Sequence, residues 1–122
     1  MGPILLMANS FNAVGNALTL SSTKSIPSPV PIQKVVQEAL RQQSDTAYPQ
    51  AIILSGSSGS GKTYASMLVL RQLFEVAGGG VETDAYKHLM ASITVLRSLG
   101  TAKTTSNSES SRIVSGHSHI YV

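Results

Sequence analysis

Apolar residues in the first half of the chain follow two different spacings, which predict strands in two segments and a helix in a third. Residues 4–8 and 51–54 are short continuous apolar runs, a pattern typical of buried strands. Apolar residues recur at helical spacing over positions 32–40, and Pro31 suits a first helical turn. We therefore expect two buried strands and, between them, an amphipathic helix over residues 31–43.

The second half of the chain contains two further helical patterns. Residues 65–74 are apolar on most faces of a helix, which predicts a helix buried between layers, and the glycines at 78–80 are expected to end it. Thr83 or Asp84 is expected to cap the next helix, which Gly100 stops. One stripe of that helix comprises Tyr86, Leu89, Met90, Ile93, Leu96 and Leu99.

Polar and proline-containing segments connect these elements. We expect an irregular loop at residues 11–18, an extended connector rich in serine and proline at 21–31, and a polar loop at 101–111. Residues 117–122 have the pattern of a strand. The resulting order of strands and helices indicates an α/β fold in a single domain over residues 1–122.

Composition narrows the classes of protein to consider. With 42% hydrophobic and 12% charged residues in 122, the chain is expected to be globular. The net charge is +3 and the nine basic residues are scattered, so we expect no nucleic-acid partner. The absence of cysteine excludes disulfides and thiolate metal sites. Because no apolar run approaches the length of a membrane span, we expect a cytoplasmic location.

A glycine-rich motif connects the strand pattern at 51–54 to the helix pattern at 65–74. It fits G-x-x-x-x-G-K-[ST] with Gly56, Ser57, Ser58, Gly59, Ser60, Gly61, Lys62 and Thr63. Its glycines allow backbone N–H groups to point at an anion, while Lys62 supplies a charge for the β- and γ-phosphates. The Thr63 hydroxyl is a suitable oxygen ligand for Mg²⁺, and the helix dipole adds positive potential.

These flanking patterns favour a nucleotide-binding loop over the alternative, a glycine turn before an ordinary helix. Strand, phosphate loop, helix, second helix and further strand together describe an incomplete P-loop NTPase core. The core is incomplete because a stable sheet of this kind needs several strands, and the sequence predicts about three.

A second motif follows the loop and ends at Arg112. Residues 107–112 read Asn-Ser-Glu-Ser-Ser-Arg, an N-x-x-S-S-R pattern that resembles the switch I motif of two families of cytoskeletal motor, the kinesins and the myosins. Residues 59–64 look locally more like kinesin. The interval between Lys62 and Ser110, however, is close to the myosin one and far shorter than the kinesin one, so the spacing favours myosin.

Other segments resemble myosin in the same order. Residues 100–104 resemble G-N-A-K-T, residues 29–39 resemble the P-P-H-I-F-A-I-A-D-x-A helix, and residues 9–11 are similar to the N-P-[YF] segment near the adenine. The chain therefore resembles the nucleotide-binding stretch of a diverged, unconventional myosin head.

Two departures from the family pattern accompany this resemblance. The myosin loop is usually G-E-S-G-A-G-K-T, and here Ser57 and Ser60 replace the Glu and the Ala. After Arg112 the family continues F-G-K-F, whereas residues 113–122 of this chain diverge.

The resemblance implies a role for individual residues. Lys62 and Thr63 would contact the phosphates of ATP and Mg²⁺, and Ser111 would make the second Mg²⁺ contact. Ser110 would lie near the attacking water and Asn107 near the phosphates. In the family Arg112 pairs with a glutamate of switch II, and these 122 residues contain no switch II.

For function, the resemblance implies the ATP-binding part of an actin-based motor, truncated before switch II and the actin-binding region either naturally or as a fragment. We expect this chain alone to be inactive or nearly so as an ATPase. Actin filaments would be a partner of the full-length product and not of these residues, with a location in the cytoskeleton as part of a myosin complex. The alternatives are a small P-loop kinase or NTPase, and a non-catalytic truncated product.

Overall fold

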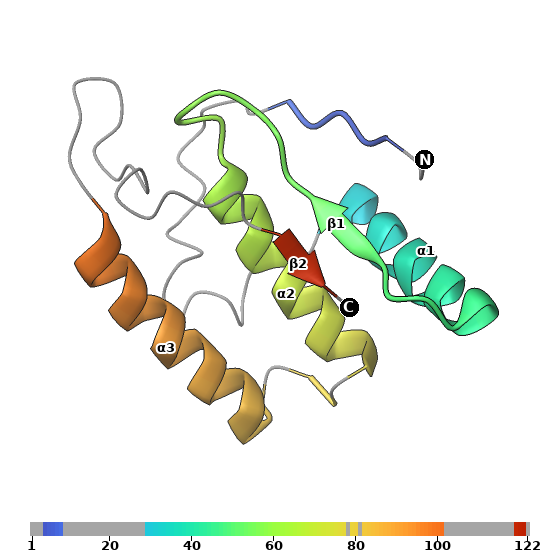
Figure 1. The fold of residues 1–122 in the computed structure, drawn as a ribbon. Coiled ribbons are helices and arrows are strands. Elements are labelled where there is room, and N and C mark those ends of the chain that lie inside the picture. The colour runs from blue at the N-terminus through green and yellow to red at the C-terminus, as the bar shows by residue number, and fades with distance from the viewer. Residues whose placement is uncertain (1–3, 9–28, 78, 81, 102–118, 122) are drawn as a thin grey trace.

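A computed structural model describes residues 4–8, 29–77, 79–80, 82–101 and 119–121. It contains three helices, α1 (Val30–Thr46), α2 (Lys62–Ala77) and α3 (Asp84–Gly100), and two short strands, β1 (Ala51–Ile53) and β2 (His119–Tyr121) (Figure 1). The predicted loop at 11–18, most of the proline-containing connector and the motif at 107–112 lie outside the described residues. The part that is described follows the predicted order of helix, strand, helix, helix and strand.

Helix α1 confirms the helix that was predicted over residues 31–43 and extends it at both ends. At its start, Ile32 and Gln33 donate backbone hydrogen bonds of 2.9 and 3.1 Å to the carbonyl oxygen of Pro29. At its end, Ala47 adopts a left-handed conformation with φ of 57°, and its N–H donates to the Gln43 oxygen at 2.8 Å. These bonds satisfy backbone groups that the two helix ends would otherwise leave without partners.

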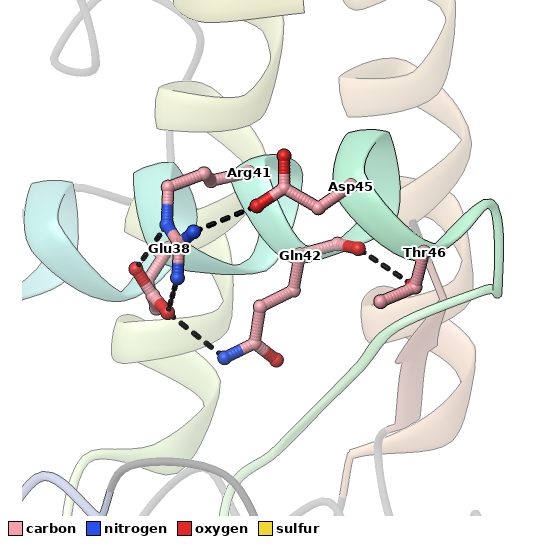
Figure 2. A network of polar contacts seen from close by, with 5 residues as sticks. All are labelled: Glu38, Arg41, Gln42, Asp45 and Thr46. Atoms are coloured by element: carbon pink, nitrogen blue, oxygen red, sulfur yellow. Dashed lines mark hydrogen bonds and ion pairs between the residues drawn. The ribbon is translucent and has the colours of Figure 1, made fainter.

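Polar contacts along the exposed face of α1 support its last turns (Figure 2). The Arg41 guanidinium lies 2.8 Å from a Glu38 oxygen and 2.7 Å from an Asp45 oxygen, which links three successive turns. Hydrogen bonds from Arg41 and then from Gln42 hold the pKa of the Glu38 carboxyl at about 2, below its ordinary value of 4.5. The Thr46 hydroxyl donates to the Gln42 carbonyl at 2.6 Å, which helps to explain why the helix continues to Thr46.

Helix α2 lies between α1 and β1 on one side and α3 on the other, as its mostly apolar surface predicted (Figure 1). On the first side, a cluster of buried residues comprises Ile32, Val36, Ile52, Leu68 and Val69. On the second side, Met67 packs with Tyr86 and Met90, and the Phe74 ring meets the Tyr86 ring edge-on at 5.2 Å between centroids. Burial on two sides explains why α2 shows no narrow apolar stripe.

The strands form an antiparallel pair in which Ala51 faces Tyr121, Ile52 faces Ile120 and Ile53 faces His119. The prediction that residues 51–54 are buried is only partly correct. Ile52 is 8% exposed, whereas Ile53 is 64% exposed. A continuous apolar run is typical of a strand covered on both faces, and here only the face that carries Ile52 packs against α1 and α2.

The prediction of a buried strand at residues 4–8 is wrong. These residues form no regular secondary structure, and Ile4 and Leu6 are 75% and 93% exposed. In the described part of the chain the sheet consists of β1 and β2, and no strand pairs with this segment. An apolar run becomes a buried strand only when a neighbouring strand and a covering layer are both available.

Helix α3 begins at the predicted cap, where the Thr83 side chain accepts a hydrogen bond from the Tyr86 N–H at 3.4 Å. The stripe along this helix is buried only in its first half, where Tyr86 and Met90 are each 1% exposed. Near the end of the helix, Leu96 and Leu99 are 66% and 79% exposed. The residues of this stripe that pack with α2 are Tyr86, Met90 and Ile93, so α2 covers its first half.

Candidate phosphate-binding site

The glycine-rich segment forms the connection between β1 and α2, at the position the sequence predicts. Strand β1 ends at Ile53, and a turn at residues 58 and 59 precedes α2, which begins at Lys62. Most of residues 56–63 are exposed, while Ser60, Gly61 and Lys62 are half-buried. The loop is therefore an accessible connection from a strand to the start of a helix.

Two glycines give the loop its shape. Gly59 and Gly61 have φ angles of 78° and 93°, in the left-handed region where glycine is strongly favoured. Between them, the Ser60 N–H donates to the Ser57 carbonyl at 3.2 Å and closes a turn. The loop therefore folds back on itself before α2 begins.

The Lys62 side chain reaches back across this loop. Its Nζ donates to the carbonyl oxygens of Gly56 and Ser57, each at 2.7 Å. An ammonium group has three donors, so one remains for another acceptor. Sequence reasoning placed this charge at the loop but did not predict the bonds to backbone carbonyls, because carbonyl positions depend on φ and ψ and leave no signal in residue identity.

The start of α2 adds positive potential to the same place. The first backbone bond of this helix is donated by Ala65 to the Gly61 carbonyl at 2.8 Å. In the part of the chain that is described, no hydrogen bond occupies the N–H groups of Lys62 and Thr63. The first turn of α2 contains no acidic residue, and no described carboxylate pairs with Lys62. An anion at this position would meet N–H donors, a helix dipole and an ammonium group.

The remaining predicted site residues divide into two groups. Thr63 is exposed in the first turn of α2, and no hydrogen bond to its hydroxyl is seen among the described residues. Ser57 and Ser58 are exposed in the loop. Asn107, Ser110, Ser111 and Arg112 lie outside the residues that the structure describes, and their roles stay predictions.

Two further features bear on the chemistry of the site. Within the described ranges, no group of three or more histidine, cysteine, aspartate or glutamate residues could hold a metal ion. The side-chain oxygens of the loop come from serine and threonine hydroxyls such as that of Thr63, a type of group that can bind Mg²⁺. In the same part of the chain, no helix is long and apolar enough to cross a membrane.

Comparison with known proteins identifies the family. Residues 15–115 match the family described as myosin head (motor domain). The match covers most of the chain, including the loop, β1 and all three helices. The chain therefore belongs to the myosin head family, which confirms the resemblance found in its motifs.

Individual relatives agree with this membership. Unconventional myosin-Vb of Homo sapiens is 38% identical over 78 residues, which is 64% of this chain and 4% of the relative. Myosin-D of Toxoplasma gondii is 31% identical over 116 residues, or 90% of this chain and 14% of the relative. Unconventional myosin-Ib of Rattus norvegicus is 43% identical over 76 residues, or 62% of this chain and 7% of the relative. No solved structure matches this one.

The chain thus spans a small part of the length of the curated relatives it matches, 4% to 14% in these three cases.

Proposed function

We propose that this chain is the ATP-binding part of a myosin-family cytoskeletal motor and that residues 56–63 hold the phosphates of ATP with Mg²⁺. The observation that carries this proposal is the position of the Lys62 ammonium, within a glycine loop that opens a helix with no acidic residue in its first turn. The order of β1, loop and α2 supports an incomplete P-loop NTPase core, and residues 1–122 would form part of a motor domain.

Phosphate binding would use groups that the loop already presents. The third donor of the Lys62 ammonium and the N–H groups at the start of α2 would bind phosphate oxygens. The Thr63 hydroxyl fits a Mg²⁺ ligand because it is exposed in the first helical turn and is an oxygen donor. Gly56, Ser58 and Gly59 would supply the backbone that encloses the phosphates.

The second motif would complete the site. By the resemblance to switch I, Ser111 would give the second Mg²⁺ contact, Ser110 would lie beside the attacking water and Asn107 would approach the phosphates. Arg112 would pair with a carboxylate supplied from outside these 122 residues. Two adjacent hydroxyls and an amide can report the γ-phosphate through a metal and hydrogen bonds.

At the level of the whole protein, we propose an actin-based motor of the cytoplasmic cytoskeleton. Membership of the myosin head family and similarity to unconventional myosins support this assignment. Actin filaments are proposed as a partner of the full-length family product, since the chain spans only a small share of its relatives.

Binding of MgATP to wild type and to Lys62→Ala tests the proposal. The substitution removes the ammonium group, so we expect the affinity for a fluorescent ATP analogue to fall at least about tenfold. Lys87→Ala on α3 is the matched control, because it removes the same charge from a side chain that pairs only loosely with Asp84, at 3.6 Å. Equal affinities for wild type and Lys62→Ala would refute the phosphate assignment.

A further inference from the structure

A groove with a volume of about 670 Å³ lies between residues 4–5 and helix α1. Residues 4–5 pass the start of α1 (Figure 1), and the groove is lined from there by residues of α1 between positions 30 and 41. The core residues Ile32 and Val36 lie on the other side of this helix, where they pack with α2 and β1. The groove shares no lining residue with the phosphate loop at 56–63, so it is a separate site.

One end of the groove is apolar. Its lining there consists of Ile4, Leu5, Val30, Pro31 and Val35. Of these, Ile4 is 75% exposed, Leu5 41% and Val30 61%, so much of their apolar surface still faces water. Sites for small molecules are concave, mostly apolar and about 300–1,000 Å³ in volume. An apolar molecule that covered these side chains would gain the free energy of removing apolar surface from water.

The charged groups of the lining are not equally available to a ligand. The Arg41 guanidinium is engaged by Glu38 at 2.8 Å and by Asp45 at 2.7 Å, and Glu38 also accepts a hydrogen bond from Gln42 (Figure 2). Lys34 is exposed and, among the described residues, has no ion pair or hydrogen bond. The lining therefore offers a cation whose charge no described carboxylate neutralises.

The position of Lys34 connects this charge to the apolar end of the groove. Lys34 follows Val30 by four residues, so the two side chains are neighbours on one face of α1, and Val35 is next to it in the sequence. Both valines line the groove together with Lys34. A ligand that matches this arrangement has an apolar body and one negative charge at its end.

We propose that the groove binds a small amphipathic anion, an alkyl chain with one terminal carboxylate, as in a free fatty acid. The carboxylate pairs with the Lys34 ammonium, and the chain covers Leu5 and Val30. A cationic amphiphile of the same length would meet Lys34 as a like charge. This binding does not involve the nucleotide loop and goes beyond the proposed function.

Decanoate is the probe, and titration calorimetry with the full 122-residue chain measures its affinity. Leu5→Asn removes apolar surface from the groove and is expected to weaken binding at least about threefold. Leu5 belongs to neither core cluster, so the substitution leaves the packing of the helices intact. Leu6→Asn is the matched control, because Leu6 is the adjacent residue, is 93% exposed and does not line the groove. Its affinity for decanoate is expected to equal that of wild type.

The charge is tested separately. Lys34→Met keeps the length of the side chain and is expected to weaken decanoate binding about two- to fivefold at low salt, as for an exposed ion pair. The difference from wild type should shrink at high salt, because salt screens exposed charges. Lys87→Met on α3 removes the same charge far along the sequence and is expected to leave the affinity unchanged. Decylammonium is expected to bind wild type more weakly than decanoate does.

Three results would overturn the inference. Absence of saturable decanoate binding, or equal weakening by Leu5→Asn and Leu6→Asn, would show that the groove is not the site. Equal binding of decanoate and decylammonium, with no effect of Lys34→Met, would refute the selection for an anion. Binding to phosphatidylserine vesicles without binding of monomeric decanoate would point to a membrane surface in place of the proposed ligand.

Discussion

Replacing Lys62 by methionine is expected to destabilise the chain even when no nucleotide is present. Methionine has a side chain of similar length without the ammonium group, so the change removes the bonds to Gly56 and Ser57 while keeping most of the volume. In this structure Lys62 is part of the fold of the loop, in addition to its proposed role in binding phosphate. A residue with only a ligand-binding role would leave the stability of the ligand-free chain unchanged.

The magnitude follows from the two bonds. An intramolecular hydrogen bond contributes about 0.5–1.5 kcal/mol net, and more when one group is charged. The bonds of Lys62 are short, at 2.7 Å, but they lie at an exposed site where water competes for both partners. We therefore expect Lys62→Met to lower the free energy of unfolding by about 1 kcal/mol in total.

The assay is urea unfolding of the ligand-free chain, followed by the helical circular dichroism signal. Lys87→Met is the control, because its loose ion pair with Asp84 is of the i,i+3 type and is expected to contribute about 0.3–0.5 kcal/mol. A loss for Lys62→Met no larger than that for the control would refute the structural role of the ammonium bridge.

Three further outcomes are expected. Leu68 is 2% exposed and packs with Ile52 of β1, so Leu68→Ala should lower the free energy of unfolding by about 2–5 kcal/mol. Leu96 is 66% exposed on α3, so Leu96→Ala should change that free energy by less than about 0.5 kcal/mol. Urea unfolding of both variants measures the contrast, and equal effects would contradict the core described for α2. Because the pKa of Glu38 falls from 4.5 to about 2 on folding, its stabilising contribution is complete above pH 4.5 and is lost as the pH falls towards 2, so Glu38→Gln should flatten the dependence of the unfolding midpoint on pH in that window. A midpoint with the same pH dependence in both proteins would argue against the Arg41 pairing. Finally, a polypeptide of these 122 residues alone is expected to show no actin-stimulated phosphate release. The reason is that the carboxylate that the resemblance assigns as the partner of Arg112 is not among its residues. Actin-stimulated phosphate release that Lys62→Ala abolishes would contradict this prediction.

The candidate site could be predicted from sequence because its determinants are local. A strand pattern, a glycine-rich loop and a helix pattern follow one another without interruption over residues 51–74, and the structure has a strand, a loop and a helix in those places. The left-handed φ values at Gly59 and Gly61 are of the kind that the motif required of its glycines. The relation of this loop to residues 107–112 was predicted only by resemblance and stays a prediction.

The sequence by itself determined the helices, the position of the loop and the membership of the myosin head family, since helical spacing, glycine positions and motif order are all written in consecutive residues. Tertiary structure decided which apolar residues are buried. Residues 4–8 and Ile53 have the same apolar character as Ile52, yet among them only Ile52 is buried, in a cluster with residues of α1 and α2. Leu99 continues the stripe of Tyr86, yet α2 covers only the first half of α3. Burial requires a covering partner, and the presence of that partner depends on contacts between segments far apart in the chain.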